Sequence, residues 1–569
     1  MQEIAVQQDA RDALREWRHG WCRDLVQSDG FLKRTIERLL PNGHAVLEDE
    51  LCKLSTRLGP SLDFLVRRNN QDANLPEVLS SDDFGAALEQ VEHHPDYAAI
   101  GEVFWGSGVL ARLAEPGHEI EAGAVAYLLD HHGEAGHACP VACTAGAIKL
   151  IRELGTEAQR QRYLPGLLET DYGRRLHAAQ FVTEVQGGSD VGANGCVATP
   201  DRDRPGWYRI RGEKWFCSVA DAGLFVVSAR LEQAPQGTRG LGLFLVPREL
   251  DGAPNGFRLR RLKTKLGTRS MPTGEIDFDG ALGEPIGDLD RGFRNLVAIV
   301  LDTSRVHNAL AACGLMRRAE LEARHFAACR TAFGQAIAGF GAVREILTRM
   351  RVRRMAAVAT TFRVLAMTDE IERSAADETE LRAARRISVM LNKYWTAVAA
   401  TDSARDGIEI LGGNGTIEDF SVMPRLYRDA IVVESWEGTH NTLCAQVFRD
   451  FQARRLHEPF FACLEREAEA LTEHVGARET GVQLVSVARD AVQRVATFDG
   501  DQGALLRAAV DRMCRAVDWV ALATQLTWDL DQGRDSRVAD ALAWYRLRIV
   551  ENRTPLEDPA LVELEDRLA

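Results

Sequence analysis

The feature that most constrains the fold is a change of pattern between residues 179 and 290. On either side of this segment, apolar residues recur at helical spacing. Within it lie short runs rich in β-branched and aromatic residues, namely WYRIRGEKWFC, LFVVSARL, LGLFLVPREL and GEIDFDG. These runs predict antiparallel strands of a barrel or sandwich. Because the strands are grouped and do not alternate with helices, the sequence indicates an α+β multidomain protein.

The helical segments carry recognisable start and stop signals. AGAIKLIREL has helical spacing, Gly155 suits its end, and Thr156 can cap the helix that follows. A further helical block extends from about residue 455 to 569 and contains 14 Arg, no Lys and 21 acidic residues. Its formal net charge is therefore −7, which is opposite to the expectation for a surface that binds duplex DNA.

Composition excludes several classes of protein. The net charge of −14 disfavours non-specific binding to nucleic acid. The 11 cysteines are odd in number and include no CxxC pair, which is typical of a reduced cytoplasmic protein. The N-terminus MQEIAVQQDARDALREW has acidic residues and no apolar core, so we expect no signal peptide. We see no run of about 18 uncharged apolar residues and therefore expect no membrane span.

Two segments of the β region could contact a heterocycle. FVTEVQGGSDVGAN contains two adjacent glycines, which let backbone N–H groups approach a ligand. It also contains the hydroxyls of Thr183 and Ser189. Its alternative interpretation is a polar loop between a helix and a strand. GEKWFCSVADAG places Trp215 and Phe216 beside Ser218, an arrangement that could stack on a ring system and hydrogen-bond to it. Its alternative is a strand with a core aromatic residue.

Three segments of the later helical region could carry chemistry. In CRTAFGQAI, Arg330 and Phe333 would share one helical face, either for a phosphate and a base or as a surface Arg beside a core Phe. EILGGNGT has three glycines in four positions, which suit an anion cradle or an ordinary turn. In ESWEGTHNTL, Glu437 lies between Trp436 and Gly438 and is either a general base or an ordinary acid near a helix start.

A cluster of metal-ligand residue types needs a separate interpretation. HHGEAGHACP brings together His131, His132, His137 and Cys139. Their spacing matches no standard zinc pattern, and helix packing accounts equally well for the spacing of Cys139 and Cys143. We therefore expect no metal site.

In their order along the chain, these segments resemble the acyl-CoA dehydrogenase family of flavoproteins over about residues 85–450. TEVQGGSD resembles the TEPxAGSD flavin loop of that family, and KWFCS resembles its KxWIT strand. RTAFGQAI, EILGG and RLYRDAIVVESWEGT resemble RxxFGxPI, QILGG and RLYRDAxxxxIYEGT. The extended N-terminus, Gln186 in the flavin loop and the appended helical block resemble the alkylation-response AidB branch of the family.

The resemblance implies a domain order, a cofactor and partners. The expected domains are an N-terminal helical domain, a β domain, a four-helix bundle and an appended helical domain, at residues 1–178, 179–290, 291–452 and 453–569. The expected cofactor is FAD, the expected assembly a homotetramer, and the expected substrate an acyl thioester of CoA or a carrier protein. The electron acceptor, either an electron-transfer flavoprotein or oxygen, stays open.

The resemblance also implies residue roles. Glu437 becomes the base that removes the proton α to the thioester carbonyl, while flavin N5 accepts a hydride from the β carbon. Ser304 occupies the alternative base position of some relatives, so Glu437 has no evident competitor. The residues implied to contact substrate are Ser189, Asp302, Arg305 and Trp436. Those implied to contact the cofactor are Val182, Thr183, Gly188, Ser189, Phe216, Cys217, Ser218, Arg330, Phe333, Glu409, Gly412, Gly413, Thr439 and Asn441.

Within this set, some roles are more specific. Phe216 stands at the flavin-stacking Trp of the family if Lys214 sets the register, whereas a shift of one would promote Trp215. Arg330 and Phe333 would hold the ADP half of a flavin that is bound mainly by a neighbouring subunit. Gly412 and Gly413 would let the chain approach the pyrophosphate.

Departures from the family pattern bear on substrate choice and function. Glu409 replaces a Gln near the pyrophosphate, Gly341 replaces a Gln, and Trp436 replaces a Tyr. The larger Trp ring should narrow the acyl pocket and favour a small, aromatic or unusual acyl group over a long straight chain. The first functional hypothesis is FAD-dependent dehydrogenation or oxidation. The second is an AidB-like DNA-associated flavoprotein with weak turnover, and the third is a flavin-dependent N-oxygenase, which would often lack the base that Glu437 supplies.

Overall fold

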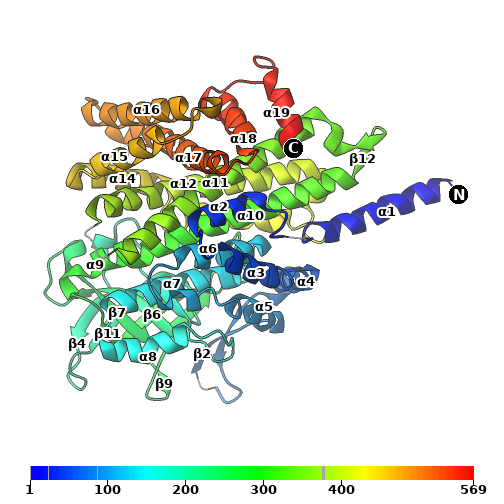
Figure 1. Cartoon of the computed structure of the whole chain (residues 1–569). Helices are drawn as coiled ribbons and strands as arrows, with labels where there is room; N and C mark the ends of the chain where they lie inside the picture. The colour runs from blue at the N-terminus through cyan, green and yellow to red at the C-terminus, as the bar shows by residue number, and fades with distance from the viewer. Residues whose placement is uncertain (1, 24, 86, 375–377) are drawn as a thin grey trace. The chain divides into compact units, whose positions relative to one another are not determined.

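The computed structural model describes residues 2–23, 25–85, 87–374 and 378–569. By internal packing the chain divides into two compact units that interleave along the sequence (Figure 1). The helical unit contains Met1–Pro60, Glu119–Gly133 and Asn308–Ala569, and the β unit contains Ser61–His118 and Glu134–His307. Helical segments precede and follow one strand-rich region, which confirms the predicted α+β class.

A seven-stranded sheet forms the centre of the β unit. Its strands are β3 (Ala178–Phe181), β4 (Val197–Pro200), β5 (Tyr208–Ser218), β6 (Leu224–Leu231), β7 (Leu241–Pro247), β10 (Phe257–Leu262) and β11 (Thr273–Pro285). β11 pairs with β5, β5 with β4, β4 with β6, β6 with β7, and β7 with β11 again. The pairing therefore closes on itself, while β10 and β3 extend from β11 and β6.

The strand runs predicted from the sequence pair antiparallel with one another, β5 with β11, β7 with β11 and β6 with β7. The sheet as a whole is mixed, because two further pairings are parallel, so the predicted antiparallel arrangement is correct only for those runs. β3 and β4 both pair parallel with β6, and they follow one another along the same edge of that strand. Ala178–Phe181 lie opposite Leu224–Val227, and Val197–Ala198 lie opposite Arg230–Leu231. The chain between them leaves this edge and returns to it. This loop between β3 and β4 is the glycine-rich segment predicted to contact a heterocycle, so the sheet fixes both of its ends.

The helices of the β unit precede and follow the strand-rich segment in the chain. They are α4 (Pro60–Asn69), α5 (Pro95–Trp105), α7 (Ala135–Leu154), α8 (Glu157–Leu167) and the short α9 (Gly292–Asn295). The predicted stop and cap are confirmed, because Gly155 follows α7 and Thr156 opens α8. Thr156 Oγ1 accepts from the N–H of Gln159 at 3.2 Å, and the Gln159 side chain accepts from the N–H of Thr156 at 3.0 Å. Two small hairpins complete the unit, β1 (Glu77–Ser81) with β2 (Ala87–Glu92) and β8 (Glu249–Leu250) with β9 (Ala253–Pro254).

The helical unit is built from long helices whose apolar faces pack on one another. They are α1 (Gln2–Gly20), α2 (Gly30–Leu39), α3 (His44–Ser55), α6 (Glu119–Leu129), α10 (Asp302–Cys329, whose first turn belongs to the β unit), α11 (Gly341–Arg373), α12 (Thr379–Leu411), α13 (Met423–Ser435), α14 (His440–Arg454), α15 (His457–Glu469), α16 (Ala477–Thr497), α17 (Leu506–Asp531), α18 (Val538–Tyr545) and α19 (Ala560–Leu568). α12 packs against α11, α13 and α15, and α17 packs against α11 and α16 (Figure 1). The C-terminal helical block thus shares a core with α11 and α12.

The N-terminal segment is anchored to the same unit by large side chains. The Trp17 indole N–H donates to the carbonyl of Glu322 at 3.1 Å, and its ring stacks on Phe420 with centroids 5.1 Å apart. The guanidinium of Arg318 lies 3.4 Å from the centre of the buried Trp21 ring. These contacts attach α1 to α10 and to the loop before α13.

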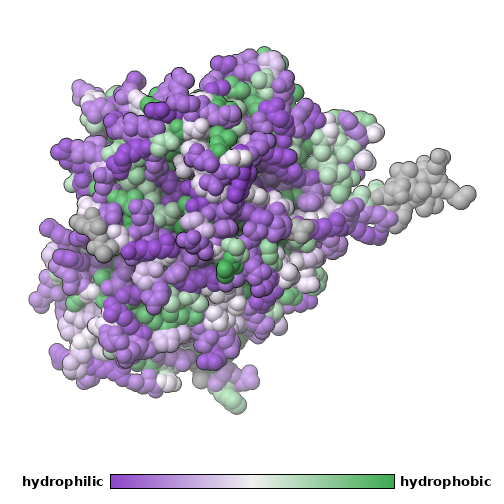
Figure 2. All heavy atoms as spheres, viewed as in Figure 1, coloured by the Kyte–Doolittle hydropathy of each residue, from purple (hydrophilic) through white to green (hydrophobic). Residues whose placement is uncertain are grey.

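Among the described residues, one helical run is long and apolar enough to cross a membrane. It is Leu289–Cys329, and 67% of its most apolar window is buried within the protein. Such burial is typical of a core helix. On the visible face of the molecule, hydrophilic side chains predominate and apolar ones form scattered groups (Figure 2).

Candidate active site

A buried ion pair holds the loop that follows β3. Lys214 Nζ lies 2.9 Å from Glu184 Oε1, and both side chains are buried. The Glu184 carboxylate also accepts from the backbone N–H groups of Gly195 at 2.6 Å and Cys196 at 3.2 Å. Lys214 donates a further bond to the carbonyl of Val182 at 3.2 Å. Since these bonds engage the start and the end of the loop, its backbone is fixed where a ligand could be recognised.

The predicted hydroxyl groups lie on this anchored loop. The Asn194 amide donates to the carbonyl of Val182 at 2.7 Å, so Val182 is restrained from two sides. Ser189 is exposed and Thr183 is half-buried. A Cβ at Gly188 would lie 2.5 Å from Thr183 Oγ1, which explains why a glycine is required beside this hydroxyl. The loop therefore brings Thr183, Gly188 and Ser189 together as the sequence predicts.

A β-bulge settles the orientation of the two aromatic residues in β5. Lys214 pairs with Ile276 and Cys217 pairs with Gly274, so three steps along β5 match two steps along β11. Lys214 and Cys217 are both buried, and the two residues between them lie at the bulge. A bulge re-aims side chains in this way because the extra residue breaks the strict alternation of faces.

The two bulge residues differ in how much of the ring is free. The ammonium group of Lys263 lies 3.4 Å from the centre of the Trp215 ring and 5.0 Å from the centre of the Phe216 ring, so it covers Trp215 more closely. Phe216 is 52% exposed. Burial raises the pKa of the Cys217 thiol, which stays protonated, so Cys217 can offer a ligand only its backbone. Ser218 ends β5 and is half-buried. Of the two rings, Phe216 is the more exposed.

The start of α10 carries the two residues implied to contact substrate. Asp302 and Arg305 are three apart on the first turn, share one face and are both buried. The Gln180 amide donates to Ser304 Oγ at 2.7 Å. The alternative base position therefore holds a hydroxyl that already accepts a hydrogen bond. A π-helical turn, η7 (Leu296–Leu301), comes directly before this segment, and such turns are frequent at functional sites.

Glu437 lies on a strained turn between α13 and α14. Trp436 ends α13 in an extended conformation, Glu437 has φ +55°, and Gly438 has φ +104°. A left-handed conformation costs a residue with a side chain about 1–2 kcal/mol, and such strain clusters at active sites. Both Glu437 and Trp436 are half-buried. Glu437 thus occupies a tight turn directly before a helix.

The prediction that Arg330 and Phe333 share a helical face is wrong. α10 ends at Cys329, and the next residues form a hairpin of β12 (Thr331–Ala332) and β13 (Gln335–Ala336). Phe333 and Gly334 have φ of +52° and +86°, the conformation of a two-residue hairpin turn. Helical pairing fails because these two residues reverse the chain. Phe333 is 98% exposed at the tip, and Arg330 is exposed at the base.

The second glycine-rich segment forms an open helix end. α12 ends at Leu411, and Gly412 has φ +60°. A Cβ added at Gly412 or Gly413 would meet no heavy atom within 4 Å, so the backbone is accessible to a ligand. Glu409 is exposed, which allows its charge to remain in water.

Two further predicted contacts open α14. Thr439 precedes the helix and Asn441 lies in its first turn, and both are exposed. Thr439 Oγ1 lies 3.0 Å from Thr442 Oγ1. Their side chains are thus accessible next to Glu437 in the chain.

Core packing accounts for the cluster of metal-ligand types. Within the described ranges, no group of three or more His, Cys, Asp or Glu side chains could hold a metal ion. In the β unit, the His137 ring stacks on Tyr97 with centroids 4.1 Å apart, and its Nε2 lies 2.8 Å from the Tyr97 carbonyl. Burial lowers the pKa of His137 to about 3, so the ring is neutral. Cys139 and Cys143 are buried neighbours with sulfur atoms 3.9 Å apart.

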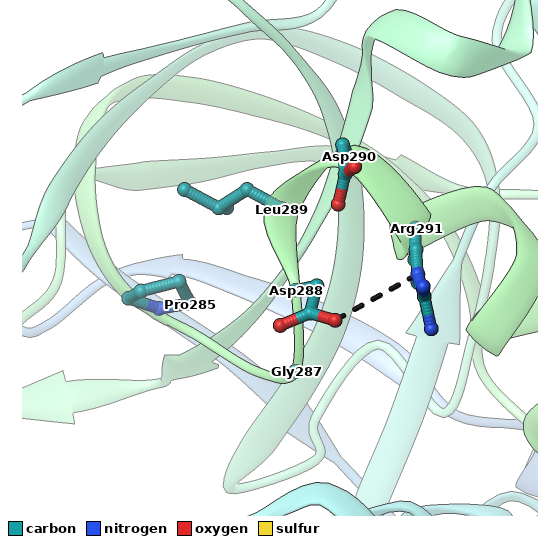
Figure 3. A pocket seen from close by; sticks show the side chains of 6 residues that line it. All are labelled: Pro285, Gly287, Asp288, Leu289, Asp290 and Arg291. Atoms are coloured by element: carbon teal, nitrogen blue, oxygen red, sulfur yellow. Dashed lines mark ion pairs between the residues drawn. The ribbon is translucent and has the colours of Figure 1, made fainter.

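A surface hollow of about 680 Å³ lies elsewhere in the β unit (Figure 3). It is lined by Pro285, Gly287, Asp288, Leu289, Asp290 and Arg291, and Asp288 pairs with Arg291 at 3.7 Å. None of the predicted site residues lines it.

Comparison with known proteins identifies the relatives of the chain. Residues 290–451 match the C-terminal domain of acyl-CoA dehydrogenases, residues 179–281 match the middle domain, and residues 21–174 match the N-terminal domain of the adaptive response protein AidB. Acyl-CoA dehydrogenase family member 11 of Caenorhabditis elegans is 30% identical over 75% of this chain and 70% of its own length. The chain belongs to the acyl-CoA dehydrogenase family.

Further relatives within the family support the AidB-like character of this member. AidB of Escherichia coli (strain K12) is 32% identical over 75% of this chain and 77% of its own length. The solved structure of Caenorhabditis elegans ACDH-11 in complex with C11-CoA superposes with a TM-score of 0.83 at 25% identity, and covers 91% of this chain and 90% of that one. This acyl-CoA dehydrogenase family member is a flavin oxidoreductase with FAD as its cofactor, and it dehydrogenates acyl-CoA-like substrates.

The structure also identifies residues that the sequence interpretation missed. Glu184, Lys214 and Asn194 hold the loop after β3 through buried polar bonds, although none was predicted as a site residue. Two signals were available. Glu184 is one of the two acidic residues inside TEVQGGSD, and Lys214 is a charged residue in the strand run that also contains Ile210 and Cys217. Each of these patterns indicates a buried partner of opposite charge.

Proposed function

We propose that the chain catalyses FAD-dependent α,β-dehydrogenation of an acyl thioester, with Glu437 as the base. Bound FAD supplies the two-electron acceptor. The observation that carries the proposal is Glu437 itself, a carboxylate held left-handed on a turn beside Gly438. The family pattern has two possible positions for the base. One of them holds Ser304, a hydroxyl that accepts a hydrogen bond from Gln180, so only the other, Glu437, carries a carboxylate.

The β unit offers groups suited to the isoalloxazine. Thr183 and Ser189 lie on the loop that the Glu184–Lys214 pair fixes, and their hydroxyls can hydrogen-bond to the ring and to the substrate end. Phe216 has the exposed ring for stacking, while Lys263 covers Trp215. We therefore assign the stacking role to Phe216, and the backbone contacts near N5 to Cys217 with Ser218.

The helical unit offers groups suited to the ADP half. Arg330 can pair with a phosphate, and Phe333 can stack on a base from the tip of an exposed hairpin. Gly412 and Gly413 leave the backbone open at the end of α12, where the pyrophosphate can approach. A hairpin that projects an apolar ring into solvent is suited to a flavin held mainly by a second copy. We propose a homotetramer on this basis and on the resemblance to the family.

The acyl group is assigned from the substitution at residue 436. Trp436 is half-buried next to the base and is larger than the Tyr of the family pattern. It favours a small, aromatic or unusual acyl group. Asp302 and Arg305 are buried on one face of α10, where they can orient the thioester end. Because ACDH-11 has been seen with C11-CoA, a substrate panel needs to extend to that length.

The test is anaerobic mixing of the FAD-loaded protein with short, branched, aromatic and C11 acyl-CoA thioesters. The flavin absorbance near 450 nm should bleach with at least one of them. Glu437→Gln is isosteric and should keep FAD while slowing bleaching by about 10³-fold or more, because general-base loss typically costs about 10²–10⁴-fold. Glu418→Gln, which removes an exposed carboxylate paired with Arg428, is the matched control and should bleach normally.

Each alternative gives a distinct result. Unchanged bleaching in Glu437→Gln would remove Glu437 from the role of base. A bound flavin that no thioester bleaches would favour the AidB-like hypothesis, which a DNA titration against salt then tests. Reoxidation of the bleached protein by air or only by an electron-transfer flavoprotein identifies the class of acceptor. Light scattering of the purified protein tests the tetramer.

A further inference from the structure

We infer that Lys393 is a positioning residue for the reaction, because it holds the turn that carries Glu437 through two main-chain hydrogen bonds. This inference rests on the proposed role of Glu437. Lys393 lies in the middle of α12 and has no exposed surface. Its ammonium group donates to the carbonyl of Glu434 at 2.9 Å and to the carbonyl of Gly438 at 3.0 Å. These two acceptors lie on either side of Glu437 in the chain.

The position of the ammonium group suits the end of a helix. Glu434 lies in the last turn of α13, where carbonyl groups have no intrahelical partner. A cation at this end also interacts favourably with the helix dipole. Lys393 therefore bonds to a carbonyl at the helix end, and it does so with a group whose charge the helix end favours.

The second bond explains how the strained turn persists. Glu437 and Gly438 both have positive φ, a conformation that the surrounding structure must hold. The carbonyl of Gly438 follows the strained residues directly, so its bond to Lys393 fixes the direction in which the chain leaves the turn. Without this bond the turn can relax, and Glu437 would leave the position set for proton transfer.

The residue after Lys393 supports the other side of the turn. The Tyr394 ring packs edge-on against His440, with centroids 4.9 Å apart. Its hydroxyl donates to Asp511 at 2.6 Å and accepts from Arg507 at 3.2 Å, both on α17. His440 stays neutral, because burial, Lys393 and Arg507 together lower its pKa to about 4. The appended helical block thus supports, through Tyr394, the helix start next to the turn that Lys393 holds.

The experiment compares Lys393→Met with a matched lysine variant in the FAD-loaded full chain. Methionine keeps the length and removes the charge and both bonds. Lys265→Met is the control, since Lys265 also donates to two main-chain carbonyls, those of Thr268 at 2.5 Å and Met271 at 2.6 Å, but in the β unit. The first readout is hydrogen exchange of the peptide covering residues 434–442, which requires no turnover. The second is the rate of flavin bleaching, measured together with the Kd of the same acyl-CoA.

In Lys393→Met we expect faster exchange confined to residues 434–442. We also expect bleaching to slow by about 10- to 100-fold, with Kd changed less than about threefold, because a misplacement near 1 Å costs up to about 100-fold in rate. Lys265→Met should leave both readouts unchanged. Wild-type exchange and bleaching in Lys393→Met would overturn the inference. The inference would also be overturned if hydrogen exchange rose throughout the helical unit and the bleaching rate fell only in proportion to the loss of bound FAD.

A second variant at residue 393 and the Glu437→Gln result separate the possible causes of a negative outcome. If Lys393→Met does not fold, Lys393→Leu, which also lacks both the charge and the N–H donor, is measured in the same way and against the same two outcomes. Normal bleaching in Glu437→Gln would refute the proposed function. The exchange experiment would then still decide whether Lys393 holds the turn.

Discussion

Asp29 is the residue through which the N-terminal segment can be tested most sharply. Its carboxylate is buried and caps α2 through the N–H of Leu32 at 3.3 Å. Arg354 Nη1 lies 3.2 Å from Oδ1, Arg317 Nε lies 3.5 Å from Oδ2, and the Tyr127 hydroxyl donates to Oδ2 at 2.7 Å. Glu320 is a second buried acid, which pairs with Arg317 and Arg354 and also with Arg324 and Arg351. Removing Asp29 therefore leaves buried positive charge uncompensated.

The magnitude follows from two separable contributions. Breaking a buried pair by removing one partner costs about 3–5 kcal/mol. Loss of an N-cap costs about 1 kcal/mol more, and Asn caps a helix about as well as Asp does. Asp29→Asn should therefore lower the free energy of opening of α2 by about 3–5 kcal/mol, and Asp29→Ala by about 1 kcal/mol more. Hydrogen exchange of the α2 amides measures this local free energy without assuming two-state unfolding of the whole chain.

The stabilisation that Asp29 provides should depend on pH in a defined direction. Burial opposes ionisation of Asp29, but Arg354 and Arg317 outweigh it and hold its pKa below the ordinary value of 3.8. The folded state thus binds fewer protons there than the unfolded state, so the stabilisation is complete above pH 3.8 and is lost as the pH falls further. The gap between wild type and Asp29→Asn should be constant from about pH 7 to 5 and shrink below about 4. A gap below about 1 kcal/mol at pH 7, or one that grows in acid, would refute the buried-charge reasoning.

Two further predictions concern the flavin loop and a buried acid. Gly188→Ala places a Cβ 2.5 Å from Thr183 Oγ1 and should weaken FAD binding about tenfold, since overpacking costs about 1–3 kcal/mol. A fluorescence titration of each apoprotein with FAD measures the affinity. Gly43→Ala is the control, because a Cβ at Gly43 meets nothing within 4 Å. Equal FAD affinities for Gly188→Ala and wild type would contradict the prediction. Burial raises the pKa of Asp130 to about 8, so its folded state retains a proton and stability falls as the pH rises from about 4 to 8. Asp130→Asn should therefore gain in thermal midpoint over wild type across this range, and a difference that is independent of pH would contradict the assignment.

The sequence predicts the elements well where local signals agree with packing. The capping box at Thr156 and Gln159, and the strands from Tyr208 to Pro285, follow from short-range spacing and residue type. Parallel pairing of β3 and β4 with β6 could not be predicted in this way, because it depends on where the loop after Phe181 returns to the sheet. The hairpin at Phe333 was hidden because helical spacing continues through Arg330, whereas two positive φ values reverse the chain.

The candidate site was predictable to the extent that its groups lie within short motifs. Thr183, Gly188 and Ser189 share one loop, and Glu437 lies beside the glycine that its turn requires. The choice between Trp215 and Phe216 needed the β-bulge, which depends on pairing with a strand about 60 residues later in the sequence. Lys393 was also out of reach, since α12 reads as a continuous helix and its bonds to Glu434 and Gly438 are tertiary.

The appended block shows how a charge count can mislead when the fold is unknown. Its net charge of −7 argues against DNA binding only if its acidic residues face solvent. Asp518 instead accepts bonds from Thr360 and Trp395, Asp511 accepts from Tyr394, and Glu467 pairs with Arg363. Burial raises the pKa of Asp518 to about 6, which reduces its charge further. These acids attach the block to α11 and α12, and Asp511 does so through Tyr394, whose ring packs against His440. The salt-dependent DNA titration consequently discriminates between the two functions more strongly than composition does.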